Sequence, residues 1–83
     1  MTDGVLCFQE PGQTLEDALA EAVACYRRRF PGREPNAATL HRNTLAAAGL
    51  EPGAVVTVAG AALTLAVGAS VLPRHLWVGR EEA

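Results

Sequence analysis

Residues 54–72 read AVVTVAGAALTLAVGASVL and contain no charged side chain. A run of this length is long enough to cross a membrane as a single helix. Its composition argues for another structure, because most of its residues are Ala, Gly, Thr or Ser, which offer little apolar surface. A soluble pair of strands and a single membrane span are therefore the two interpretations of this segment, and the strands are favoured.

The pattern inside this segment has a period of two, which is typical of a strand with one buried face. The triplets VTV and LTL each place a threonine opposite an aliphatic pair. Gly60 and Gly68 interrupt the runs at turn spacing. We predict strands at 54–59 and 62–67, joined by a turn at 60–61.

A last strand is expected at about 71–78. Pro73 cannot donate a hydrogen bond to a neighbouring strand, so this strand is predicted at a sheet edge or bulged there. Leu76 and Val78 would face the core, while His75 and Trp77 would point to the other face. An exposed tryptophan on an edge strand would favour association, and the alternative is that Trp77 packs beneath residues 5–8.

A helix over residues 14–30 is the clearest element. Thr14 has the chemistry of an N-cap, Asp17 stands three residues later, and Pro31 and Gly32 follow the end. Acidic residues come early in this segment and arginines late, as the helix dipole favours. One helical stripe collects its larger apolar residues and one alanine: Leu15, Leu19, Ala22, Val23, Tyr26 and Phe30.

The remaining elements are short. Residues 5–9 are strand-like, 37–42 form a short strand, and 44–48 form a brief helix with Asn43 as its cap and Gly49 after its end. The fold class is α+β: one main amphipathic helix on a mostly antiparallel sheet of three to five strands, with a β-rich C-terminal half. We expect a single small domain over 1–83, with frayed ends at 1–4 and 80–83.

Composition restricts the classes of function. The formal net charge is −2 and is shared evenly by the two halves, so a basic nucleic-acid arm is absent. All seven cationic residues are arginine, and alanine is abundant, which is typical of a GC-rich bacterial genome or its phage. The first residues lack the pattern of a signal peptide, so a cytoplasmic protein is expected. A core this small favours stabilisation by a partner, and we expect a homodimer.

No motif indicates an active site. Cys7 and Cys25 do not form a C-x-x-C pair and are interpreted as small hydrophobic residues in a reducing compartment. His41 and His75 do not have the spacing of metal ligands, so no metal and no cofactor are predicted. Phosphate-binding glycine motifs are absent. Enzymatic activity stays open, its absence is favoured, and an enzyme using His41 or His75 is a minor alternative.

Four arginines, Arg27, Arg28, Arg29 and Arg33, form the strongest local charge. They could bind an acidic protein or a phosphate-bearing ligand, because a guanidinium pairs with such groups bidentately. Alternatively, they only complement the helix dipole.

We therefore predict a small interaction module that self-associates through its C-terminal strand. Its partner-binding residues would be His75, Trp77 and the four arginines. The first alternative is a nucleic-acid-associated regulator, antitoxin-like or phage-encoded, that uses the arginine-rich helix end. The second is a single-span membrane protein through 54–72.

Overall fold

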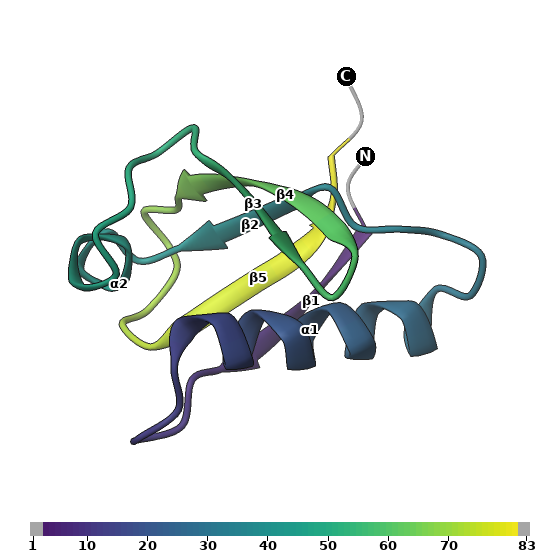
Figure 1. The fold of residues 1–83 in the computed structure, drawn as a ribbon, viewed down its shortest axis with the longest axis horizontal. Helices are drawn as coiled ribbons and strands as arrows, with labels where there is room; N and C mark the ends of the chain where they lie inside the picture. The colour runs from purple at the N-terminus through teal and green to yellow at the C-terminus, as the bar shows by residue number, and fades with distance from the viewer. Residues whose placement is uncertain (1–2, 82–83) are drawn as a thin grey trace.

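The computed structural model describes residues 3–81 and shows a five-stranded sheet with two helices against one face (Figure 1). The strands lie in the order β1-β5-β2-β4-β3, and all neighbours are antiparallel except β2 and β4. The predicted α+β class is confirmed. Along the chain the elements are β1 (Asp3–Phe8), α1 (Leu15–Arg29), β2 (Ala37–Leu40), α2 (Arg42–Ala47), β3 (Val55–Val58), β4 (Ala61–Val67) and β5 (His75–Arg80).

The main helix α1 begins and ends as its sequence predicts. The hydroxyl oxygen of Thr14 accepts a hydrogen bond of 3.1 Å from the backbone N–H of Asp17. At the other end, the N–H of Phe30 donates to the carbonyl oxygen of Tyr26 at 2.8 Å. The buried side chains of α1 follow one stripe: Ala18, Leu19, Ala22, Val23 and Tyr26.

The uncharged segment 54–72 supplies β3 and β4, as its period-two pattern predicts. No helix among residues 3–81 is long and apolar enough to span a bilayer. The hairpin turn lies at Ala59 and Gly60, one residue earlier than predicted. Both residues have positive φ, 50° and 82°, as a two-residue type I′ turn requires. A type I′ turn matches the right-handed twist of the two paired strands, so the hairpin adopts it. Ala59 therefore holds a positive φ that is less favourable for alanine than for glycine.

The short helix α2 begins earlier than predicted because His41, not Asn43, is its cap. The imidazole Nδ1 of His41 accepts a hydrogen bond of 3.0 Å from the N–H of Asn43. Gly49 follows the helix with φ of 71°, in the left-handed position that the sequence indicates.

The position of β5 corrects one prediction. This strand is not at an edge but lies between β1 and β2, and the edges of the sheet are β1 and β3. Pro73 precedes β5, which starts at His75, so the proline removes no hydrogen bond from the sheet. The ends also differ from the prediction, because Asp3 pairs with Arg80 in the β1–β5 ladder. Residues 1, 2, 82 and 83 lie outside the described part of the chain.

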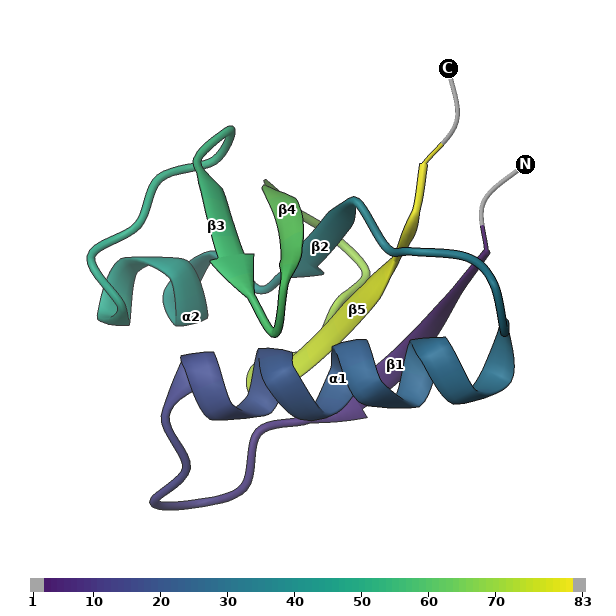
Figure 2. The ribbon, with the colours of Figure 1, turned by 45° about the vertical axis from the view of Figure 1, so that its right-hand side comes forward.

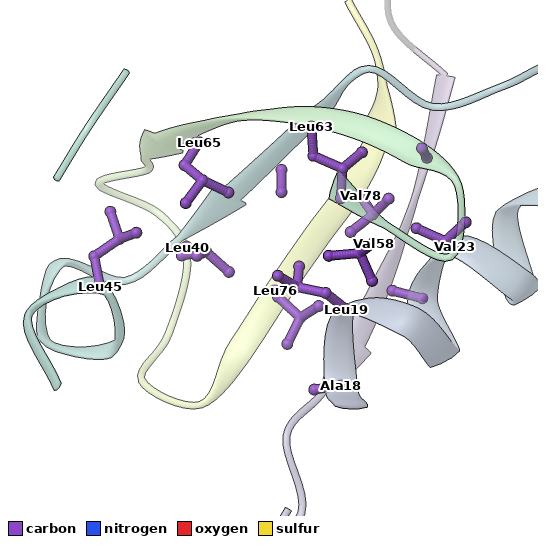
Figure 3. Close-up of a cluster of buried hydrophobic side chains, with 13 residues drawn as sticks. Ala18, Leu19, Val23, Leu40, Leu45, Val58, Leu63, Leu65, Leu76 and Val78 are labelled. Carbon is purple, nitrogen blue, oxygen red and sulfur yellow. The ribbon is translucent and has the colours of Figure 1, made fainter. Parts of the chain in front are cut away.

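The core lies between the inner face of the sheet and the helices (Figure 3). Leu76 and Val78 on β5 are fully buried there, as predicted. Leu45 of α2 fills the end of the core near Leu40 and Leu65 (Figure 3). Both helices therefore use the same face of the sheet, and this leaves the second face for other contacts.

Candidate functional site

We call the second face of the sheet the outer face, because neither α1 nor α2 packs on it (Figures 1 and 2). Strand alternation and the observed register place uncharged side chains on it from all five strands. They are Leu6, Phe8, Ala37, Thr39, Val55, Thr57, Ala62, Thr64, Ala66, His75 and Trp77. No Asp, Glu or Arg stands among the outer-face positions of β1 to β5 in the described chain. A sheet face that meets only water normally carries polar and charged residues in alternation with the core positions.

Trp77 lies on β5, the second strand from one edge of the sheet, with Leu6 opposite it on β1 and Thr39 opposite it on β2. Its indole rests on the backbone of Gly4, where an added Cβ would collide with the ring. The side chain is half-buried. Trp77 is therefore not an exposed residue of an edge strand, because β5 has a partner on each side. It packs against the N-terminal strand at Gly4, just before residues 5–8, and also lines the hollow on the outer face.

Large apolar side chains surround this tryptophan. Leu6 is 66% exposed, and Leu72, in the loop before β5, is 63% exposed. They line a shallow hollow of about 540 Å³ together with Thr39, Ser70, Val71, His75, Trp77 and Glu81. Glu81, which directly follows β5, gives the rim of this hollow one carboxylate. The hollow is largely apolar because Leu6 and Leu72 expose large aliphatic side chains beside the Trp77 ring, an arrangement that is uncommon on a surface that contacts only water.

His75 belongs to the same face but makes local contacts. Its ring meets the ring of Phe8 edge-on, with centroids 5.1 Å apart. Its Nδ1 lies 3.2 Å from the carbonyl oxygen of Pro73. These contacts hold the imidazole against β1, and they give no indication of a catalytic partner.

Arg27 has a structural role. Its Nε donates to a carboxylate oxygen of Glu34 at 2.8 Å, its Nη2 donates to the second oxygen, and its Nη1 donates to the carbonyl oxygen of Ala59 at 2.9 Å. This bidentate hydrogen bonding lowers the pKa of Glu34 and raises the pKa of Arg27. Arg27 therefore joins the end of α1 to the following loop and to the β3–β4 turn.

The other three arginines do not gather around Arg27. Arg28 donates to the sulfur of Cys25 at 3.2 Å, and the guanidinium of Arg29 lies 6.0 Å from the centre of the Phe30 ring. Arg33 is exposed in the loop after the helix. The predicted four-arginine cluster is therefore divided, with Arg28 and Arg29 on the side of α1 that faces β1.

An open groove between α1 and β1 brings the two cysteines together. Cys7 of β1 and Cys25 of α1 both line it, with Arg28 and Arg29 on the helix side. Burial, the neighbouring Cys25 thiol and, more weakly, Glu21 raise the pKa of Cys7. Both thiols are free and half-buried.

Sequence reasoning missed this pair because it looked for cysteines close in the chain. Cys7 has the same parity as the inward positions of β1, and Cys25 stands one position before the buried Tyr26 of α1. From these two placements the sequence indicates that each thiol points toward the space between the helix and the sheet. The docking of α1 beside β1, which brings them together, is a tertiary feature.

Other chemistry-bearing residues are dispersed. Within residues 3–81 no three His, Cys, Asp or Glu side chains are grouped so that they could hold a metal ion. His41 caps α2 and His75 contacts Phe8, so the two histidines lie in separate environments. No protein-family model, curated protein or solved structure matches the chain.

Proposed function

We propose that this protein is a small interaction module that self-associates through the outer face of its sheet. One observation carries the proposal: no outer-face position of the five strands holds a charged side chain, in a chain with sixteen charged residues (seven arginines and nine acids). Glu81, just after β5, is at the rim of the hollow. Exposed apolar surface of this kind marks an interaction site. The contact would be made by stacking faces rather than by pairing β5 with another strand, because both sides of β5 already have partners.

A second copy is the occupant that the chemistry of the face favours. Two copies can bring the uncharged strand positions of their outer faces together while Glu81 stays at the rim in contact with water, so that no unpaired charge is buried. A two-fold axis places the patch of one copy against the same patch of the other. Two sheets stack at a spacing of about 10 Å when their facing side chains interlock. The hollow beside Trp77 could then receive Leu6 or Leu72 of the other copy.

The size of the face predicts a weak dimer. Five strands spaced about 4.8 Å apart, each about 17 Å long, cover roughly 400 Å² in projection. Standard stable interfaces bury about 800 Å² on each partner. We therefore expect association at concentrations of roughly 10–100 µM, with the dissociation constant varying with salt only slightly because the strand positions of the face are uncharged and Glu81 lies at its rim.

Sedimentation at increasing concentration tests the proposal. Leu6→Arg places a charge on the face at a position that is already mostly exposed, so the fold should persist and the dimer should be lost. Val67→Arg is the matched control, because Val67 is also an exposed aliphatic residue of the sheet but is not on the outer face. A wild-type chain that remains monomeric at about 1 mM, or a dimer that survives Leu6→Arg, would refute the outer-face interface.

A further inference from the structure

The groove between α1 and β1 holds two thiols, and one of them contacts a guanidinium. Cys7 and Cys25 face the groove from different elements, and Arg28 donates to the sulfur of Cys25 at 3.2 Å. Half-buried cysteines in a small core commonly serve as packing residues alone. Their meeting in an open groove beside positive charge is a different arrangement, since thiol exchange requires access and is assisted by nearby cations.

We propose that Cys7 and Cys25 form a thiol–disulfide exchange site that reacts with small anionic disulfides and closes to a disulfide between β1 and α1. The substrate class follows from the charges on the groove wall, where Arg28 and Arg29 would attract carboxylates of the incoming molecule. The two thiols lie on the helix side of the sheet, whereas the proposed interface lies on the other side, and Leu6 at the sheet edge borders both.

The two cysteines have different roles. Cys25 attacks first, because the positive charge of Arg28 lies next to the sulfur that carries the negative charge during attack. Cys7 is the resolving thiol, and its raised pKa makes it the poorer initial nucleophile. Arg28 does not exchange protons or electrons; it is a positioning residue for Cys25.

The exchange balances in two steps. The Cys25 thiolate attacks one sulfur of the small disulfide, forms a mixed disulfide and releases one small thiolate, which takes up the proton that Cys25 lost. Cys7 then gives up its proton and attacks the Cys25 sulfur, which forms the Cys7–Cys25 bond and releases the second small thiol. The protein dithiol loses two electrons in total, and the small disulfide gains them.

Closure requires the two sulfurs to approach to about 2.05 Å, with the Cβ atoms about 3.5–4.5 Å apart. The position of β1 makes this adjustment possible. As an edge strand, β1 is held by hydrogen bonds to β5 on one side only. A shift of β1 toward α1 therefore leaves the pairing of the other four strands unchanged.

The direct test is a titration of the reduced full chain with oxidised glutathione. We expect both thiols to disappear together, the mass to fall by two hydrogens, and a proteolytic map to join Cys7 to Cys25. Closure in the folded chain should be roughly 100-fold more favourable than in the same chain unfolded in urea, because folding has already brought the two segments together. Two unreactive thiols, a lasting glutathione adduct on the wild-type chain, or disulfides between chains would each overturn the proposal.

Single variants separate the roles of the two thiols. Cys7→Ser should stop at a mixed disulfide between Cys25 and glutathione, because the resolving thiol is missing. Cys25→Ser should react at least several-fold more slowly at Cys7. Circular dichroism checks that both variants are folded. The titration of the wild-type chain tests disulfide closure even if a variant fails to fold. Equal reactivity of the two variants would refute the assigned order of attack.

The charge of the substrate is tested by comparing two disulfides. Arg28→Gln should slow reaction with anionic oxidised glutathione about 3–10-fold more than reaction with uncharged hydroxyethyl disulfide. Arg28→Lys should restore part of the difference, since it keeps the charge. Arg42→Gln is the control, because Arg42 is an exposed arginine of α2 and does not line the groove. This substitution should change neither rate. If Arg28→Gln changed both rates equally, selection for anionic disulfides would be wrong.

Discussion

Tyr26 is fully buried on α1, and its hydroxyl finds no hydrogen-bond partner among the described residues. Its ring packs against Phe30 with centroids 4.9 Å apart. An unsatisfied buried hydroxyl costs about 1–3 kcal/mol, because the group loses its bonds to water on folding. Tyr26→Phe removes that cost and keeps the ring. We therefore expect the free energy of unfolding to rise by about 1–2 kcal/mol.

Urea denaturation, followed by the fluorescence of Trp77 and by circular dichroism, measures this gain. For a domain of this size, an increase of about 1 kcal/mol also raises Tm by roughly 4–8 °C. Tyr26→Ala is the control for burial and should cost about 3–5 kcal/mol through the cavity it creates. If Tyr26→Phe instead destabilised the protein by about 1 kcal/mol, the hydroxyl would have a bonding partner and the reasoning would be refuted.

Three further predictions concern local contacts. Gly4→Ala should displace the Trp77 indole, cost about 1–3 kcal/mol and shift the fluorescence to longer wavelength, whereas an unchanged spectrum would contradict the stacking. Ala59→Gly should raise the unfolding free energy by up to about 1 kcal/mol, because glycine adopts the positive φ of the turn without strain, and a loss of stability on urea titration would argue against it. The lowered pKa of Glu34 means that its pairing with Arg27 stabilises the fold above the unfolded pKa of about 4.3 and is lost as pH falls through the lower folded value. Glu34→Gln should remove this part of the acid dependence, and identical acid denaturation curves would count against the pairing.

Local patterns predicted the elements well. The capped stripe of α1 and the inward positions Leu76 and Val78 both follow from spacing in a single segment. Such features depend on neighbours only a few residues away, so the sequence displays them directly. The alternation that separated the strands of 54–72 from a membrane helix is of the same kind.

Sheet order was not accessible in this way. Pro73 suggested that the last strand lies at an edge of the sheet. The order of strands depends instead on which distant segments pack together, and β1 pairs with β5 on the side away from β2. The candidate sites depend on this same choice. Trp77 packs on Gly4 because β1 lies beside β5, and Cys7 lies near Cys25 because β1 also packs against α1.

The pairing of β1 with β5 has a mechanical consequence. Asp3 and Arg80 are opposite one another at the same end of an antiparallel ladder. A pulling force applied at these two residues acts along the inter-strand hydrogen bonds, which lie perpendicular to the strands. The bonds would then be loaded one pair after another, as in a zipper, and not all at once as in shear. In a force–extension measurement the fold should open at low force from this end, with β1 peeling away before the rest of the sheet.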